Sequence, residues 1–190
     1  TFTYRYPVRQ NGTYWYHSHT GLQEQLGHYG QLILEPAEPD PVDFDVEHSI
    51  VLSDWTFEDP HRVLWKLKTM EGYYNFQRPT LANIDDQMRA TGMSFGEVVS
   101  KRLAWDRMRM DPTDIADITG ATYSYLMNGR TADENPTFLA APGQRVRLRI
   151  VNASTMTFYD VRIPGLPMTV VQADGQNVRP VETDELRIAV

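Results

Sequence analysis

The sequence predicts an all-β protein, a Greek-key β-sandwich with a mostly helical insertion. Short runs rich in aromatic and β-branched residues alternate apolar with polar positions, which is typical of strands. Turn dipeptides separate these runs, among them Asn128-Gly129, Pro164-Gly165 and Asp174-Gly175. Between about residues 60 and 118 the alternation gives way to helical periodicity, which predicts the insertion.

Composition narrows the class of protein. The chain has 190 residues, 41% hydrophobic and 23% charged, which fits one or two globular domains. Its net charge of -7 argues against binding to nucleic acid or to anionic membranes. No apolar run approaches the roughly 20 residues that span a bilayer, so we expect no membrane partner. Because the chain has no cysteine, it forms no disulfide and supplies no thiolate to a metal.

Residues 1–35 predict three strands, Phe2 to Tyr6, Thr13 to His19 and Gly30 to Leu34, with a turn at Asn11-Gly12. Three strands do not make a sandwich by themselves. The chain also opens within a strand-like alternation and without a starting Met. We therefore expect it to be a piece of a longer protein, with most of this first domain outside the sequence.

Residues 36–45 contain three prolines and four acidic residues, which predicts an extended, solvated linker. A second and incomplete domain is expected over residues 46–190, and its strands are predicted at 47–55, 122–128, 145–153, 158–163, 168–173 and 185–190. In the third of these, Arg145, Arg147 and Arg149 alternate with apolar residues, so we interpret them as a solvated face.

The insertion contains two helical signals. A helix is predicted from Leu81 to about Thr91, because Gly92 is a typical C-terminal stop. Ser94 and Glu97 have the spacing of a capping box, which predicts that a further helix begins there.

The chemistry of the chain centres on His17 and His19. Both lie in a predicted strand, where residues two apart point to the same face with Cα atoms about 6.6 Å apart. Imidazoles at that spacing suit two neighbouring metal ions better than one, and neutral imidazole suits copper, zinc, iron or nickel. By itself the pattern also fits two structural or surface histidines. We interpret the remaining histidines as structural or solvated, namely His28 and His61 in loops and His48 in a strand.

The residues around this pair resemble a known family. The run Gly12 to His19, followed by Gln23-Glu24-Gln25 and Tyr29 to Leu34, is similar to the second His-x-His motif of multicopper oxidases, which closes their first cupredoxin domain. The resemblance implies that His17 and His19 are ligands of the type 3 copper pair in a trinuclear cluster. Trp15 is expected on the same strand face, so we also expect it to wall the site.

The second half resembles one subgroup of that family. Tyr125 to Arg130, Pro142 to Arg149, Val151 to Ser154 and Ala173 to Gln176 are similar to the second domain of CopA-like copper-resistance oxidases. The resemblance implies cupredoxin-like domains and an oxidase that couples oxidation of cuprous ion or phenols to reduction of dioxygen to water. It also implies a periplasmic or secreted location.

The sequence departs from the family pattern in what it lacks. It contains neither the upstream His-x-His motif nor the third domain, so the remaining cluster ligands and the type 1 copper are expected outside this chain. We therefore expect the chain alone to be inactive and to need the rest of a parent chain or complementary chains. Two alternatives stay open: a two-domain copper enzyme of the small-laccase or nitrite-reductase type, and a non-catalytic copper-binding cupredoxin module.

Overall fold

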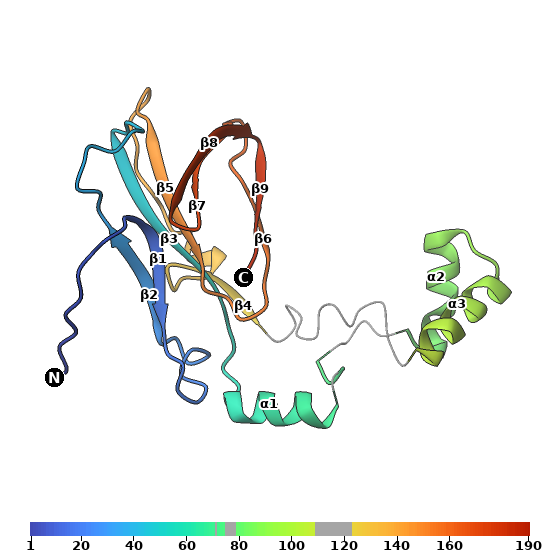
Figure 1. Cartoon of the computed structure of the whole chain (residues 1–190). Helices are drawn as coiled ribbons and strands as arrows, with labels where there is room; N and C mark the ends of the chain where they lie inside the picture. Colours follow the sequence, from blue (N-terminus) through green and yellow to red (C-terminus); the bar gives the residue numbers. More distant parts are fainter. Residues whose placement is uncertain (71, 75–78, 109–122) are drawn as a thin grey trace. The chain divides into compact units, whose positions relative to one another are not determined.

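The chain divides into two compact units. The computed structural model describes residues 1–70, 72–74, 79–108 and 123–190 (Figure 1). The first unit comprises Thr1–Trp55 together with Ser124–Val190, and the second comprises Thr56–Tyr123. The second unit is therefore inserted between two segments of the first.

A three-stranded sheet forms the centre of the first unit. Strand β3 (Val46–Trp55) lies between β4 (Ser124–Met127), which is antiparallel to it, and β5 (Val146–Asn152), which is parallel. Ile50, Leu52 and Val151 are at most 8% exposed, so the apolar core of this unit lies on β3 and β5.

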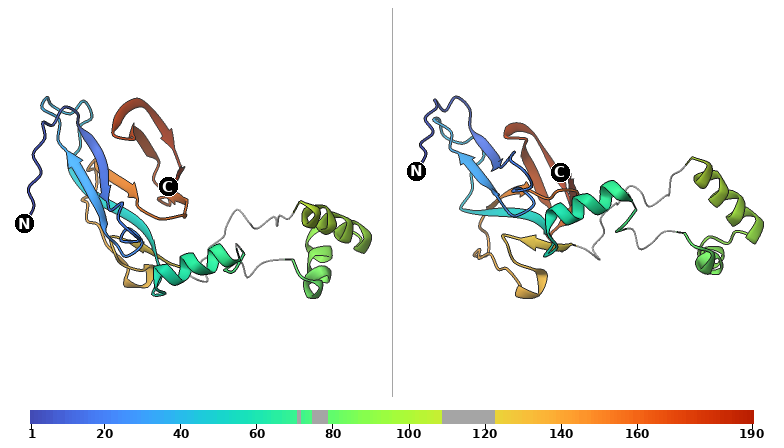
Figure 2. Two further views of the ribbon diagram at one scale, coloured as in Figure 1. Left: turned by 60° about the horizontal axis from the view of Figure 1, so that its bottom comes forward. Right: turned by 90° about the horizontal axis from the view of Figure 1, so that it is seen from below.

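A hairpin of β1 (Gly12–His17) and β2 (Tyr29–Leu34) packs beside β3 and β5 (Figures 1 and 2). The antiparallel register pairs Gly12 with Leu34 and His17 with Tyr29. Gly12 has a φ of 136°, and a Cβ at this position would overlap the backbone of Gly175. The start of β1 therefore needs a glycine, both for its backbone conformation and for close packing.

The C-terminal strands form two further antiparallel pairs. One joins β6 (Tyr159–Arg162) to β9 (Glu185–Ile188), and the other joins β7 (Met168–Ala173) to β8 (Gln176–Thr183). The sequence did not predict β8, because Pro180 and two charged residues, Arg179 and Glu182, interrupt its alternation. Proline is tolerated there because β8 is hydrogen-bonded to β7 alone among the described strands.

The second unit has the predicted helical character. It contains α1 (Pro60–Thr69), the 3-10 turn η1 (Leu81–Asn83), α2 (Ile84–Thr91) and α3 (Phe95–Arg107). The Gly92 stop and the Ser94–Glu97 capping box are both confirmed, and Gly92 has a φ of 70°. His61 lies in the first turn of α1 rather than in the predicted loop, and it is exposed as expected. The part of the predicted insertion at 71, 75–78 and 109–118 lies outside the described residues.

The predicted first strand, Phe2 to Tyr6, is wrong. Residues 1–11 form no strand, and Phe2, Tyr4 and Tyr6 are 60–81% exposed. Side-chain alternation favours a strand only where a partner strand accepts its hydrogen bonds, and no described strand pairs with this segment. The predicted turn at Asn11-Gly12 therefore connects no hairpin.

The arginine face of β5 is also not solvated as predicted. Arg145 is exposed, but the side chains of Arg147 and Arg149 are only 11% and 6% exposed. Arg147 pairs with Asp40 and donates to the Val42 carbonyl at 2.8 Å, while its guanidinium stacks on Phe44. The segment 36–45 was predicted to be solvated, but Arg147 holds it against β5. The sequence alternation had predicted that this arginine is solvent-exposed.

Candidate metal centre

His17 and His19 lie at the end of β1, but only His17 belongs to the strand. β1 ends at His17, and the backbone N–H of Ser18 donates to the carbonyl of His28 at 3.0 Å, which continues the pairing of His17 with Tyr29 by one hydrogen bond before the loop between β1 and β2. The predicted strand of Thr13 to His19 is therefore two residues too long. The two imidazoles are nevertheless neighbours, with ring centroids 4.5 Å apart and planes inclined by 39°.

Trp15 packs against the His17 ring, on the strand face where it was expected. Because Trp15 and His17 are two residues apart on one strand, their side chains share a face. Their rings are parallel within 7° and their centroids are 4.1 Å apart. The indole therefore covers one side of the His17 ring and limits its rotation.

Glu24 contacts the same ring from the loop. Its Oε2 lies 2.9 Å from Nδ1 of His17, and the two side chains are 36% and 24% exposed. A metal-binding histidine commonly donates its second ring nitrogen to a carboxylate, and this contact has that form. Glu24 is not among the site residues predicted from the sequence. The acidic residue seven positions after His17, within a polar run, is the signal that could have identified it.

The two residues beside Glu24 fix the loop at other points. Gln23 accepts a hydrogen bond from the Ser18 hydroxyl at 2.7 Å and lies 3.4 Å from Nδ1 of His28. Gln25 lies 2.9 Å from the hydroxyl of Thr155, which comes from the loop after β5. Three consecutive loop residues, Gln23 to Gln25, thus contact Ser18 and His28, His17, and Thr155 in the second half of the chain.

The loop after β5 is itself anchored on a buried carboxylate. Asp54, near the end of β3, is only 3% exposed. It accepts hydrogen bonds from the backbone N–H groups of Thr155 and Met156 and from the hydroxyls of Thr155 and Thr157, over 2.8 to 3.3 Å. The carboxylate therefore fixes the residue that contacts Gln25.

The hairpin β1–β2 is joined to β5 by Arg149. Its guanidinium donates to the Thr13 hydroxyl at 3.0 Å, and its backbone carbonyl accepts from the Gln31 amide at 3.0 Å. Arg149 also lies 2.7 Å from Glu47 on β3. These contacts span more than a hundred residues of sequence and hold the histidine-bearing strand on the central sheet.

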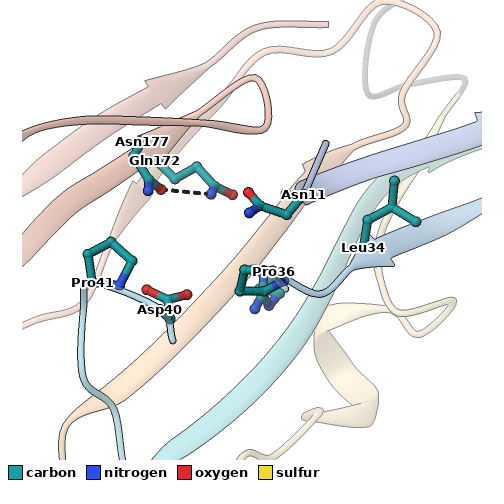
Figure 3. A pocket seen from close by; sticks show the side chains of 9 residues that line it. Asn11, Leu34, Pro36, Asp40, Pro41, Gln172 and Asn177 are labelled. Atoms are coloured by element: carbon teal, nitrogen blue, oxygen red, sulfur yellow. Dashed lines mark hydrogen bonds between the residues drawn. The ribbon is translucent and has the colours of Figure 1, made fainter. Parts of the chain in front are cut away.

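A small polar cavity lies between the hairpin, the segment 36–41 and β7–β8 (Figure 3). Asn11, Arg149, Gln172 and Asn177 are among its lining residues, and Gln172 donates to Asn177 at 3.1 Å. Its volume of about 20 Å³ suits roughly one water molecule and is too small for an organic substrate. This cavity therefore has the character of a hydration site.

The other described histidines do not gather at the pair. His48 Nε2 lies 2.9 Å from the Leu139 carbonyl, as expected for a structural histidine, while His28 and His61 are exposed. Within the described residues, no group of three or more His, Asp or Glu side chains has the arrangement of a metal site. Further ligands for a metal at His17 and His19 would therefore have to come from outside the described residues.

A β-rich fold with two adjacent imidazoles at the end of a strand is compatible with a copper protein of the cupredoxin type, and comparison with known proteins identifies the family. A multicopper oxidase family model matches residues 47–190, and a second multicopper oxidase model matches residues 1–39. The chain belongs to the multicopper oxidase family. The family predicted from the sequence is confirmed, and copper is the cofactor of that family.

Individual relatives agree with the predicted subgroup. The chain is 53% identical over 190 residues to copper resistance protein A of Escherichia coli, and 51% identical over 189 residues to copper resistance protein A of Pseudomonas syringae pv. tomato. Each alignment covers 100% of this chain and 31% of the relative. The chain thus spans about a third of the length of the curated relatives it matches.

Solved structures confirm the predicted fold class. Fet3p, described as a multicopper oxidase that functions in iron import, matches with a TM-score of 0.63 and 25% identity, covering 96% of this chain and 26% of Fet3p. The blue copper oxidase of Nitrosomonas europaea matches with a TM-score of 0.61 and 21% identity, covering 99% of this chain and 45% of that chain. The second likeness bears on the fold alone.

Proposed function

We propose that this chain is the central part of a multicopper oxidase linked to copper resistance. In this proposal residues 1–35 complete a first cupredoxin domain, 36–45 form the linker, and 46–190 belong to a second domain with its insertion at about 60–118. The observation that carries the proposal is the adjacent imidazole pair of His17 and His19, with ring centroids 4.5 Å apart. Family membership supports copper as the metal.

The donor set fits copper. Two neutral imidazoles side by side are suitable ligands for copper, and the contact between His17 Nδ1 and Glu24 leaves Nε2 of His17 for a metal. We propose that His17 and His19 hold the type 3 coppers. The remaining cluster ligands and a type 1 copper would come from residues outside this chain.

The proposed reaction oxidises cuprous ion or a phenol by one electron at a time and reduces dioxygen to water. Each dioxygen takes up four electrons and four protons to give two waters, so four substrate molecules are oxidised in each cycle. Bound copper supplies the electron-transfer chemistry that protein side chains lack. The chain's own contribution is to hold the His17 ring between Trp15 and Glu24 and to anchor its loop on Thr155.

The test is the replacement of both histidines by alanine in the complete oxidase. We expect loss of the absorbance of the coupled copper pair and loss of dioxygen consumption, because two adjacent ligands are removed. Replacing His48 by alanine is the matched control, since that histidine contacts the Leu139 carbonyl instead. Unchanged copper content and activity in the double variant would refute the ligand assignment.

A second measurement separates an oxidase from a non-catalytic copper-binding module. We expect the complete, copper-loaded protein to oxidise a phenolic dye with matching dioxygen consumption. A protein that binds copper but oxidises neither the dye nor cuprous ion would favour the module.

No described helix is long and apolar enough to cross a membrane. Separately, we propose a periplasmic or secreted location from the resemblance to copper resistance proteins.

A further inference from the structure

The His17 ring is held on two sides and at one nitrogen. The Trp15 indole stacks on one face of the ring, the His19 ring lies beside it, and Glu24 Oε2 lies 2.9 Å from Nδ1. Among the residues that the structure describes, His19 has no corresponding contact with a carboxylate. The two histidines of the pair are therefore held in different ways.

A carboxylate at this position selects one tautomer of the imidazole. An ionised carboxylate only accepts hydrogen bonds, whereas a neutral imidazole has one N–H donor and one acceptor nitrogen. Because Glu24 faces Nδ1, that nitrogen must carry the proton to make a hydrogen bond. The lone pair is then on Nε2, which is the nitrogen left for a metal.

Glu24 is itself held in place by its loop. The N–H of Gly27 donates to the Glu24 carbonyl at 2.9 Å, and the N–H of His28 donates to the Gln23 carbonyl at 3.0 Å. The neighbouring Gln25 contacts Thr155 across the chain. These contacts fix the backbone from which the carboxylate reaches the ring.

We propose that Glu24 is the positioning residue of His17, fixing its Nδ1–H tautomer and its ring plane so that Nε2 faces the copper. This inference rests on the proposed function, because it assumes that His17 is a ligand. Glu24 acts through His17 and does not itself bind the metal.

The test compares Glu24→Ala, Glu24→Gln and Glu38→Ala in the complete oxidase. Glu24→Gln retains an oxygen that accepts from Nδ1, while Glu38→Ala removes an equal charge from an exposed position. The first readout needs no copper: ¹⁵N NMR of histidine-labelled apoprotein at alkaline pH reports which ring nitrogen of His17 carries the proton. The second readout is retention of copper against a chelator.

We expect the Nδ1–H tautomer at His17 in the wild type and in Glu24→Gln, and a shift towards Nε2–H in Glu24→Ala. His19 should keep its tautomer in all three variants. Copper retention should weaken about 10- to 100-fold in Glu24→Ala, as is usual when the partner of a ligating histidine is removed. Glu38→Ala should match the wild type.

Two results would overturn the inference. One is an Nε2–H tautomer at His17 in the wild type, and the other is a Glu24→Ala variant that matches Glu38→Ala in both readouts. If the double His17 and His19 variant loses copper while Glu24→Ala behaves as wild type, only the role of Glu24 is refuted. If the double variant keeps its copper, the proposed function itself fails.

Discussion

Asp54 joins the central sheet to the loop after β5, which contacts the loop that follows His17 and His19. Its buried carboxylate accepts hydrogen bonds from residues 155 to 157, and Thr155 in turn contacts Gln25. Replacement by alanine would leave several of these donors without an acceptor in a buried site. Hydrogen bonds to a charged group typically contribute about 1.5–3 kcal/mol each, so the removal is severe.

We predict that Asp54→Ala lowers the free energy of unfolding by about 3 kcal/mol or more. Asp54→Asn should cost less, because the amide keeps one accepting oxygen. Thermal and urea unfolding of the complete protein measure the effect, and Asp43→Ala is the control because its side chain is 79% exposed. Equal stability of the Asp54→Ala and Asp43→Ala variants would contradict this account of the loop.

Asp40 gives a pH-dependent contribution that can be isolated. Its hydrogen bond with the Arg147 guanidinium is the main cause that holds the pKa of the Asp40 carboxyl below its ordinary value of 3.8, while burial acts in the opposite direction. A carboxyl with a lowered pKa in the folded state stabilises that state above the unfolded pKa, and the stabilisation is lost as pH falls through the folded pKa. The contribution is therefore fully present at neutral pH.

We predict that Asp40→Asn is less stable than the wild type at pH 7 and that the difference shrinks once the pH falls below about 3.8. Denaturant unfolding at a series of pH values measures this difference. Asp43→Asn is the control, because its contact with Arg145 at 3.5 Å is solvent-exposed and should contribute little. A difference between wild type and Asp40→Asn that stays constant with pH would contradict the role of the ion pair.

Local sequence signals predicted turns and helix caps well, but they did not predict tertiary contacts. The Asn128-Gly129 turn and the Ser94–Glu97 capping box are confirmed, because neighbouring residues determine both. Asp54 and Thr155 lie 101 positions apart, so spacing gives no sign of their contact. The 4.5 Å approach of His17 and His19 was predictable in outline from their spacing, although the strand ends at His17 and does not include His19.

At the scale of elements, the errors arise where pairing or burial depends on distant parts of the chain. Alternation in Phe2 to Tyr6 resembles that of a strand, but no described strand supplies a partner. The alternation in β5 predicted that Arg147 is solvent-exposed, whereas Asp40 and Phe44 of the preceding segment 36–45 cover its side chain. Helix ends in the second unit were predictable because glycine and capping residues act within one turn.

The chain leaves the central sheet for the helical unit and returns to it at two residues that are paired across neighbouring strands. Trp55, the last residue of β3, is directly opposite Ser124, the first residue of β4. A short turn can therefore replace residues 56–123 without displacing either strand. The unit has its own internal contacts, such as the hydrogen bond from the buried Tyr74 hydroxyl to Glu58 at 2.6 Å.

We predict that replacing residues 56–123 by a short Asn-Gly turn alters substrate preference before it alters copper loading. Long inserted segments often cover access to a site, while the candidate ligands His17 and His19 lie in the other unit. Copper content and relative rates with cuprous ion and a phenol measure the two effects. Loss of copper with unchanged substrate preference would contradict the role of this unit in substrate access. Tyr74→Phe, with the unit otherwise intact, is the control for local destabilisation.

At the scale of the whole molecule, the proposed function implies that residues 1–190 by themselves supply only part of an oxidase. The chain has no cysteine thiolate for a blue copper, and its single His-x-His pair provides fewer ligands than a three-copper cluster needs. The hairpin β1–β2 is a two-stranded sheet, and the residues before it expose Phe2, Tyr4 and Tyr6. Unpaired strand edges beside exposed aromatic side chains favour association with other chains.

We predict that residues 1–190, purified alone and loaded with copper, consume no dioxygen with a phenolic substrate and aggregate or keep only the part after residue 45 folded. The physical reason is that, in the proposed arrangement, the remaining strands of the first domain and the remaining cluster ligands lie outside this segment. Oxygen consumption, light scattering and hydrogen exchange measure activity, association and residual structure, with the complete oxidase as the positive control. Turnover by a monodisperse monomer that shows both blue and coupled copper signals would overturn the ligand count and the proposal that further domains are needed.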